Sequence, residues 1–384
     1  MRTRDDLLVR QMASARRIET LADKTLDYGV DGMRMVLTPE HESSFEELLL
    51  SWYSRQTAYG RIAGTGSHVP EGRLTNQDLQ KLVETTPEWI ETRTGIGERR
   101  IVGEGQAASD LALPAARRAL ESARVGAEEI DLIVVATVTP DTWMPSTACW
   151  LQARLKCRRA IAFDVNAACS GFVYALAIAD NFIRAGKVKS ALVVGVDVFS
   201  KIVNYQDRAT CLLFGDGAGA VVLEATTGDS RVLSTHLYAD GAGAKALEVP
   251  AGGSRLPACH ETVERRLHTV TMPNGQEVFR SAVRGMSEAV QAALDENGVT
   301  VDDLALLIPH QANIRILEAV GERLGVNRER LFTNLERYGN TSAASIPLAL
   351  DEACRGGRLA PGDLVMLAAF GAGFTWGSAL VRWG

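Results

Sequence analysis

Short apolar runs alternate with longer amphipathic runs along the chain from about Tyr59 onward. In the first half, the continuous β-branched runs at 132–137 and 191–196 predict buried strands, while the patterns at 107–123 and 171–185 predict helices. The helix at 171–185 is apolar on nearly every side, which predicts a central and buried position. This alternation is typical of helices that cover a mostly parallel sheet, so we expect an α/β fold.

The second half of the chain repeats this plan. Its predicted strands lie at 304–308 and 364–369, and its predicted helices at 314–324 and 346–354. In each half an acidic stretch leads into a strand, as EEIDLIVVAT in the first and DDLALLIPHQ in the second. These parallels suggest an internal duplication. We predict two similar halves, at 58–232 and 233–384.

Residues 1–57 precede this pattern and carry charges of both signs, with helix-like stretches at 7–26 and 45–53. The early arginines are reminiscent of an organelle transit peptide, but the acidic residues of the segment, among them Asp5 and Asp6, argue against one. We expect either an appended helical extension or an upstream start codon. No chemistry can be assigned to this segment.

The overall composition narrows the class of protein. Of the 384 residues, 46% are hydrophobic and 23% are charged, as in ordinary soluble globular proteins. The formal net charge of −6 provides no general attraction for nucleic acid. No apolar run reaches the roughly 18 residues of a membrane helix, and the N-terminus lacks the apolar core of a secretory signal. We expect a cytoplasmic protein that binds neither nucleic acid nor membrane.

One of the six cysteines stands in a distinctive context. None of the six forms a CxxC pair, so we expect reduced thiols. In IAFDVNAACSG, an apolar strand runs into small residues, then Cys169, then the predicted buried helix. The free N–H groups and the dipole of a helix N-terminus favour an anion, so we expect a lowered pKa for the Cys169 thiol and a reactive thiolate. A packed cysteine in a tight turn is the alternative from this segment alone.

Two further polar residues occupy positions suited to ligand binding. His310 ends the strand LALLIPH, and open α/β sheets bind ligands at the carboxyl ends of their strands. Asn340 lies in RYGNTSAAS, where Gly339 permits an unusual backbone angle and the Asn340 amide could donate to a developing oxyanion. A core histidine and a turn asparagine are the alternatives when each residue is taken alone.

Two segments are rich in glycine. FGAGFTWG at 370–377 follows a strand and suits a loop whose backbone N–H groups point into a pocket. GDGAGA at 215–220 comes before the strand AVVLE rather than before a helix, so we interpret it as structural and not as a dinucleotide site. The sequence has no Walker loop, no paired zinc-ligand motif and no GxGxxG after a first strand. We therefore expect neither a metal nor another cofactor.

Seven segments, in order and at matching spacing, carry a resemblance to the ketoacyl synthase III family. They are GTGSHVP, EWIETRTGIGER, DVNAACSGF, FGDGAGAVVLE, IPHQANIRI, RYGNTSAASIP and FGAGFTWGSALVRW. The chain resembles this family from about Tyr59 to its last residues. The resemblance implies a thiolase-like fold with αβαβα layers. It also implies an acyltransferase that condenses acetyl-CoA or another short acyl-CoA with malonyl-acyl carrier protein to initiate fatty acid biosynthesis.

The same resemblance implies a role for each candidate site residue. Cys169 would hold the acyl group as a thioester, while His310 and Asn340 would stabilise the enolate left by loss of CO2 from the malonyl group. The backbone N–H groups of Cys169 and Ala372 would form the oxyanion hole for acyl transfer. The remaining family positions would bind CoA, at Trp89, Arg93, Arg208 and Arg315, or line the acyl pocket, at Met144, Phe279 and Phe370.

The chain departs from the family pattern at three places. Gly97 stands where acetyl-specific bacterial members often have an arginine. Met144 replaces an aromatic residue that in relatives reaches into the acyl pocket of the partner subunit, so the acyl-chain preference is open. The extension at 1–57 has no counterpart in the ordinary family pattern. The family also implies a homodimer.

Three other interpretations stay open at this point. An enzyme of polyketide or other specialised metabolism could load an unusual starter, or form an ester or amide, on the same three residues. A papain-like cysteine hydrolase also has Cys, His and Asn in this order, but its cysteine lies near the mature N-terminus in a CGSCW-like signature. A non-catalytic acyl-CoA-binding protein would be expected to lack one of the three residues, and all three are present.

Overall fold

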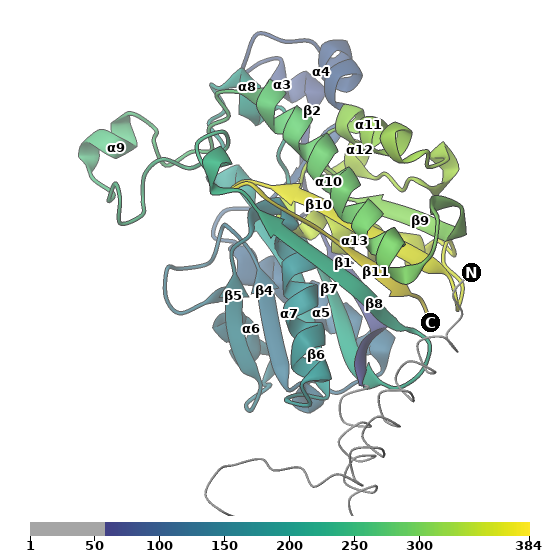
Figure 1. The fold of residues 1–384 in the computed structure, drawn as a ribbon. Helices are drawn as coiled ribbons and strands as arrows, with labels where there is room; N and C mark the ends of the chain where they lie inside the picture. Colours follow the sequence, from purple (N-terminus) through teal and green to yellow (C-terminus); the bar gives the residue numbers. More distant parts are fainter. Residues whose placement is uncertain (1–57) are drawn as a thin grey trace, which may run out of the picture. The chain divides into compact units, whose positions relative to one another are not determined.

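Residues 58–384 are described by the computed structural model, and they form two β-sheets with helices between and outside them (Figure 1). The predicted extension at 1–57 lies outside the described residues. The first sheet has the strand order β1-β7-β6-β4-β5, in which β6, β4 and β5 are parallel and β7 is antiparallel to β6 and β1. Its strands are Tyr59–His68 (β1), Leu132–Ala136 (β4), Ile161–Val165 (β5), Ser190–Val198 (β6) and Asp216–Thr226 (β7).

The second sheet has the order β8-β11-β10-β9, with β9 and β10 parallel and β11 antiparallel to β10 and β8. This arrangement repeats the order and directions of β1, β7, β6 and β4, which supports an internal duplication. The connection between the sheets follows Thr226, close to the division that we propose at residue 232. The strands are Arg231–Ala239 (β8), Leu304–Pro309 (β9), Leu364–Gly371 (β10) and Thr375–Arg382 (β11), and a separate two-stranded antiparallel sheet pairs Gly72–Thr75 (β2) with Glu98–Ile101 (β3).

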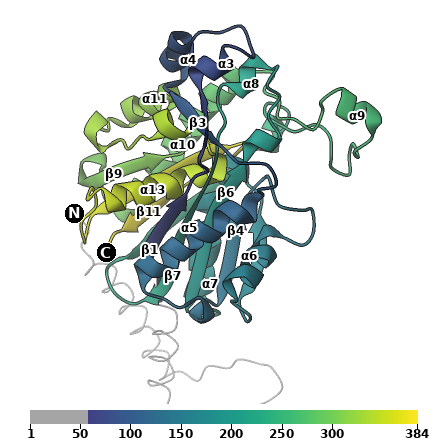
Figure 2. The ribbon, with the colours of Figure 1, turned by 180° about the vertical axis from the view of Figure 1, so that it is seen from behind.

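The longer helices occupy three layers around the two sheets. α5 and α6 pack on the outer face of the first sheet, α7 and α13 lie between the sheets, and α10 and α11 cover the outer face of the second sheet (Figures 1 and 2). These αβαβα layers confirm the predicted fold class. The helices are Ala108–Ala123 (α5), Thr147–Leu155 (α6), Gly171–Arg184 (α7), Gly275–Asn297 (α10), Ile314–Leu324 (α11) and Ser345–Arg355 (α13).

Shorter helices lie outside these layers, at Asn76–Leu79 (α3), Pro87–Thr94 (α4), Arg208–Cys211 (α8), His260–Glu264 (α9) and Leu335–Tyr338 (α12). Within residues 58–384, the strands and helices predicted from the hydrophobic pattern are confirmed, with ends within two residues of the prediction, while the helix-like stretches predicted at 7–26 and 45–53 lie outside the described residues. The reason is that these elements are buried on defined faces, and burial imposes the apolar periodicity that the sequence displays.

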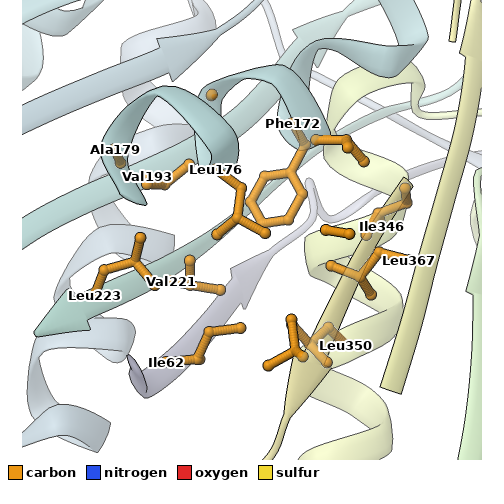
Figure 3. Close-up of a cluster of buried hydrophobic side chains, with 14 of the residues drawn as sticks. Ile62, Phe172, Leu176, Ala179, Val193, Val221, Leu223, Ile346, Leu350 and Leu367 are labelled. Atoms are coloured by element: carbon orange, nitrogen blue, oxygen red, sulfur yellow. The ribbon is translucent and has the colours of Figure 1, made fainter. Parts of the chain in front are cut away.

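Helix α7 has the central position that its apolar surface predicts. Phe172 and Leu176 on this helix are fully buried and pack with Val193 of the first sheet, with Ile346 of α13 and with Leu367 of the second sheet (Figure 3). Because both sheets bury apolar surface against α7, this helix holds the loops at its N-terminal end in a fixed position. Cys169 precedes that end directly.

Replacing Phe172 by alanine is expected to lower the free energy of unfolding by about 3–5 kcal/mol, because the side chain has 0% exposure and the surrounding sheets cannot collapse into the space it leaves. Chemical denaturation followed by circular dichroism measures this loss. Replacing Leu82, which is 52% exposed, by alanine serves as the control and should change the stability by no more than about 0.5 kcal/mol. Equal losses in the two variants would contradict the central packing of Phe172.

The glycine-rich segment at 215–220 lies within a strand, so the prediction that the strand follows it is wrong. β7 begins at Asp216 and includes Gly217 and Gly219, while Gly215 directly precedes it. A Cβ atom at Gly219 would lie 2.6 Å from the backbone nitrogen of Leu348, in α13. The absence of a side chain at Gly219 therefore lets α13 approach the strand closely, which is a structural role for this glycine.

Candidate active site

A cavity of about 570 Å³ brings together Cys169, His310 and Asn340, which are distant in the sequence. Cys169 comes from the turn before α7, His310 from the end of β9, and Asn340 from the segment before α13. All three side chains are nearly buried, with exposures of 5%, 2% and 6%. The three residues singled out from separate motifs thus share one cavity between the two halves of the fold.

The turn that carries Cys169 has a constrained backbone. It forms a short 3-10 helix, Ala168–Ser170 (η2), between β5 and α7. Ala168 has a φ of +47°, in the left-handed region that residues with a Cβ rarely adopt. The hydroxyls of Ser170 and Thr375 both donate to the carbonyl oxygen of Ala167, at 2.7 and 2.9 Å. These hydrogen bonds hold the turn in place and link it to the glycine-rich loop at the start of β11.

The glycine-rich loop lies directly against the Cys169 turn. A Cβ atom at Gly371 would lie 2.7 Å from the backbone nitrogen of Cys169 and 3.0 Å from that of Ser170, so a side chain there would collide with the turn. Ala372 is the next residue, in the connection between β10 and β11. The predicted pair of backbone donors, Cys169 and Ala372, therefore belongs to two segments that are in close contact.

The expectation of a lowered pKa for the Cys169 thiol is wrong for this structure. Burial raises the pKa of Cys169 to about 12, and the negative charge of Asp197 adds to the effect. The thiol does precede α7, as predicted. However, it lies in the protein interior, where removal from water disfavours the thiolate more than nearby N–H groups stabilise it.

His310 is held as a neutral imidazole in a defined orientation. Its Nδ1 lies 2.7 Å from the hydroxyl oxygen of Ser345, which also accepts a hydrogen bond from the backbone nitrogen of Gln311. When the Ser345 hydroxyl donates to Nδ1, the imidazole proton is on Nε2. Burial lowers the pKa of His310 to about 3. The Nε2–H group can therefore donate to a ligand in the cavity without carrying a full positive charge.

Asn340 is oriented by hydrogen bonds to its own segment. Its side-chain oxygen accepts from the backbone nitrogen of Ser342 at 2.9 Å, and its backbone nitrogen donates to the carbonyl oxygen of Leu213 at 2.9 Å. With the amide oxygen engaged in this way, the amide Nδ2–H₂ group is the part of the side chain that can donate into the cavity. Asn340 and His310 thus supply two neutral donors.

The predicted CoA-binding residues lie in and beside the same cavity. Arg93 and Arg315 line it, together with the predicted pocket residues Phe279 and Phe370. Trp89, which is 40% exposed, lies next to Arg93 on α4, with its ring centroid 5.9 Å from that guanidinium. The guanidinium of Arg208, from α8, lies 4.1 Å from the same centroid. Arg93 therefore lies both in the cavity wall and beside Trp89, which Arg208 contacts from α8.

Met144 lies apart from this cavity. It is 85% exposed, in the loop before α6, and its neighbour Trp143 is 83% exposed. Among residues 58–384, Met144 is not part of the wall around Cys169. Any role in an acyl pocket therefore requires a second subunit.

Four residues with a place in the site were not found from the sequence: Asp197, Ser342, Ser345 and Thr375. Asp197 could have been identified because it is an acidic residue at the end of the apolar run ALVVGVD. Buried carboxylates are rare unless they are paired. Ser342 and Ser345 occur in a run of small residues and Thr375 lies between two aromatic residues, and none of the three had a signal of this kind.

Within the described range 58–384, no group of three or more His, Cys, Asp and Glu side chains is arranged to hold a metal ion. None of the helices of this range combines the length and the apolar character needed to cross a membrane.

Comparisons with known proteins agree with this geometry. Residues 163–248 match the family described as 3-Oxoacyl-[acyl-carrier-protein (ACP)] synthase III, and residues 294–383 match its C-terminal family. The chain is 53% identical over 322 residues to the beta-ketoacyl-[acyl-carrier-protein] synthase III of Caldanaerobacter subterraneus subsp. tengcongensis, a match that covers 84% of this chain and 97% of that protein.

Two solved structures extend the comparison. The 3-oxoacyl-[acyl-carrier-protein] synthase III of Aquifex aeolicus is similar at 46% identity and a TM-score of 0.78, over 84% of this chain and all of that chain (100%). A priming beta-ketosynthase from a polyketide biosynthetic pathway is similar at 35% identity and a TM-score of 0.78, over 85% of this chain and 96% of that chain. Together with the shared motifs, these similarities show that the chain belongs to the 3-oxoacyl-[acyl-carrier-protein] synthase III family of acyltransferases.

Proposed function

We propose that this protein joins the acyl group of acetyl-CoA or another short acyl-CoA to malonyl-acyl carrier protein by a decarboxylative Claisen condensation. The products are a 3-oxoacyl-acyl carrier protein, CO2 and CoA, and the reaction begins fatty acid biosynthesis. The observation that carries the proposal is the cavity that Cys169, His310 and Asn340 line together with Arg93 and Arg315.

In the first half-reaction, the thiolate of Cys169 attacks the thioester carbonyl of the acyl-CoA, and the acyl group becomes bound to the enzyme. The carbonyl oxygen gains negative charge in this step. The backbone N–H groups of Cys169 and Ala372 stabilise that charge, and one such donor contributes about 3–4 kcal/mol in comparable sites. The close contact between Gly371 and the Cys169 turn supports this assignment.

In the second half-reaction, the malonyl group loses CO2 and leaves an enolate. The Nε2–H group of His310 and the Nδ2–H₂ group of Asn340 donate to the enolate oxygen. The low pKa of His310, about 3, supports a role as a neutral donor rather than as a proton-carrying acid. The enolate carbon then attacks the acyl-Cys169 carbonyl, and the 3-oxoacyl product forms as the thiolate leaves.

Trp89 is assigned to stacking on the adenine ring of CoA, with Arg93 and Arg208 facing its phosphates. Replacing Trp89 by alanine is expected to raise the KM for acyl-CoA about tenfold without changing kcat, because base–aromatic stacking stabilises the bound substrate and not the reacting atoms. Steady-state kinetics measure both constants. With an acyl-pantetheine substrate that lacks the adenine, the variant and the wild type should have equal KM values. An equal loss with both substrates would contradict the stacking assignment.

We propose that the protein is a homodimer that pairs along β5. This strand is at the edge of the first sheet, and its first residue, Ile161, is 46% exposed. Open apolar strand edges are readily covered by another chain. The exposed Trp143 and Met144 would then be available to a partner's acyl pocket. Light scattering that finds a stable monomer at micromolar concentration would contradict this proposal.

We propose a cytoplasmic location, because all six cysteines are free and would be exposed to oxidation in a compartment that forms disulfides. Cell fractionation with antibody detection tests the location, and recovery of the protein outside the cytoplasm would overturn it.

A second candidate function is the loading of a starter unit in a polyketide or other specialised pathway. It is favoured by the similarity to the priming beta-ketosynthase. The same cysteine, histidine and asparagine would serve, so the two functions differ in the starter and the carrier protein and not in the chemistry.

Intact-protein mass spectrometry tests the proposed function directly. The protein is mixed with a panel of acyl-CoAs, its mass is recorded, and malonyl-acyl carrier protein is then added. We expect an acyl adduct on Cys169 that the malonyl substrate converts to a 3-oxoacyl product, and the preferred starter distinguishes fatty acid synthesis from specialised metabolism. An unmodified Cys169 with every acyl-CoA would refute both functions.

A further inference from the structure

Arg99, on β3, is a fully buried cation that neither half-reaction uses. Its exposure is 0%. Its Nε, at 3.1 Å, and its Nη2 both donate to the carbonyl oxygen of Leu212, and its Nη1 donates to the side-chain oxygen of Asn76 at 2.6 Å. Burial lowers the pKa of Arg99 to about 10, so the guanidinium still carries its charge at neutral pH. Arginine is rarely fully buried unless it is paired, and here both acceptors are neutral oxygens.

The carbonyl group that Arg99 holds lies at the start of the segment that binds the backbone of Asn340. The backbone nitrogen of Asn340 donates to the carbonyl oxygen of Leu213 at 2.9 Å, and the backbone nitrogen of Gly215 donates to the carbonyl oxygen of Asn340 at 3.0 Å. Phe214 and Asn340 thereby form a short parallel bridge. Arg99 fixes the peptide group that leads into this bridge.

The aliphatic part of the Arg99 side chain also packs on the bridge. Gly339, which precedes Asn340, has a φ of +67°, and a Cβ atom there would lie 3.0 Å from Cγ of Arg99. A Cβ atom at Gly215 would lie 3.3 Å from Cβ of Arg99. Both glycines thus leave the space that the arginine side chain occupies. Arg99 therefore lies against both segments of the bridge, 212–215 and 339–340.

Asn76, at the start of α3, holds the guanidinium from another direction. It is 5% exposed, and its side-chain nitrogen donates to the carbonyl oxygen of Ile96 at 2.8 Å while its side-chain oxygen accepts from Arg99. Ile96 lies in the connection from α4 to β3. The guanidinium is therefore anchored to a second buried residue, and the hydrogen bonds to Leu212 come from a fixed donor.

The position of the bridge decides where the Asn340 amide points. Its Oδ1 accepts from the backbone nitrogen of Ser342 at 2.9 Å, so the direction of the Nδ2–H₂ group follows the same backbone. The other donor, His310, is held separately, with its Nδ1 2.7 Å from the hydroxyl oxygen of Ser345. A displacement of about 1 Å in a group that acts on the substrate can slow a reaction about a hundredfold. Movement of the bridge would weaken one donor to the enolate oxygen and leave the other in place.

We propose that Arg99 is a positioning residue for decarboxylation, which holds the segment 212–215 so that the Asn340 amide is directed toward the enolate oxygen. This inference rests on the proposed function, because it presupposes the malonyl substrate and its enolate. Within residues 58–384, Arg99 is buried and is not part of the wall around Cys169, so it acts through Asn340 and has no contact with substrate. Acylation of Cys169 does not involve Asn340 and should not depend on Arg99.

The test replaces Arg99 by methionine, which removes all of its donors, and by lysine, which keeps the charge but donates from a single nitrogen. Malonyl-acyl carrier protein decarboxylation is measured in the Cys169→Ala background. We expect Arg99→Met to lower kcat about tenfold to a hundredfold with an unchanged KM, and Arg99→Lys to lower it less, because a displaced Asn340 still provides part of its stabilisation. Arg184→Met serves as the control, since Arg184 pairs with Asp180 on α7, and should leave the rate unchanged.

Combination with Asn340→Ala separates positioning from a general effect on the fold. If Arg99 acts through Asn340, then Arg99→Met should slow decarboxylation no further once Asn340 is alanine. In proteins that keep Cys169, acylation by acyl-CoA should be as fast in Arg99→Met as in the wild type, as measured by intact-protein mass spectrometry. An equal loss of acylation and decarboxylation would overturn the inference, and so would an undiminished effect of Arg99→Met in the Asn340→Ala background.

The remaining outcomes are also decisive. Unchanged decarboxylation in Arg99→Met would overturn the inference, and if that variant does not fold, Arg99→Lys decides by the same measurements. If the Cys169→Ala parent does not decarboxylate malonyl-acyl carrier protein, the proposed function fails and the inference fails with it. A parent that decarboxylates, with Arg99 variants that match its rate, would contradict the inference alone.

Discussion

Replacing Cys169 by alanine is expected to slow condensation from acyl-CoA by about a thousandfold or more, because no sulfur is then available to carry the acyl group. Malonyl-acyl carrier protein decarboxylation should persist, since His310 and Asn340 are unchanged. Radiolabelled malonyl substrate measures both reactions in one sample, as 3-oxoacyl product and as released CO2. The size of the effect follows from covalent catalysis, in which the thioester divides one difficult condensation into two easier steps.

The chain provides a matched control for this experiment in Cys157. That thiol is also buried, with 1% exposure, and burial raises its pKa to about 11. However, Cys157 packs among apolar side chains near α5 and α6 and does not line the cavity. Cys157→Ala should therefore keep full condensation activity. If both cysteine variants lost activity equally, the loss would reflect damage to the fold, and the assignment of the nucleophile would be wrong.

Replacing His310 or Asn340 by alanine is expected to slow decarboxylation by about a hundredfold to a thousandfold, because each removes one donor to the enolate oxygen. Acylation of Cys169 by acyl-CoA should continue, so the acyl-enzyme accumulates and is visible by intact-protein mass spectrometry. Replacing His68, which lines a separate cavity, should affect neither step. Loss of acylation in the two site variants would contradict the assignment of acylation to Cys169 and of decarboxylation to His310 and Asn340.

The pH dependence of decarboxylation is a second test of the role of His310 as a neutral donor. The pKa of His310 is lowered from 6.5 to about 3, so the imidazole is neutral above that value and becomes protonated only in strong acid. We therefore expect the decarboxylation rate of the Cys169→Ala variant to show no inflection near pH 6.5, where an ordinary histidine titrates. An inflection near that value would mean that His310 is accessible to protons from solvent and is not held as a neutral donor.

Much of the fold could be predicted from the sequence because it depends on local pattern. Helix α7 was located from an apolar surface on all sides, and α11 from its amphipathic period, since both patterns follow directly from the faces that these helices bury. The segment GDGAGA was misplaced for a related reason. Glycine has no side chain, so the segment shows no alternation of apolar and polar side chains that would indicate a strand. The close approach of α13 to Gly219 explains why this part of the strand has a residue without a side chain.

The residue types of the site were also determined by the sequence, because Cys169 follows and His310 ends a predicted strand, while Asn340 lies in a glycine-containing segment of small residues. Their electrostatics depended on tertiary structure. Position before a helix predicted a low pKa for Cys169, but the depth at which the two sheets bury the thiol decides the pKa, and depth is not a local property. Asp197 accepts a hydrogen bond from the backbone nitrogen of Ala343 only because the tertiary structure places the short helix Ser342–Ala344 (η7) against β6. The sequence by itself determined the helices, the strands and the reactive side chains that they carry. The tertiary structure decided which of these side chains meet in the buried interior, because burial and contact depend on residues that are distant in the sequence.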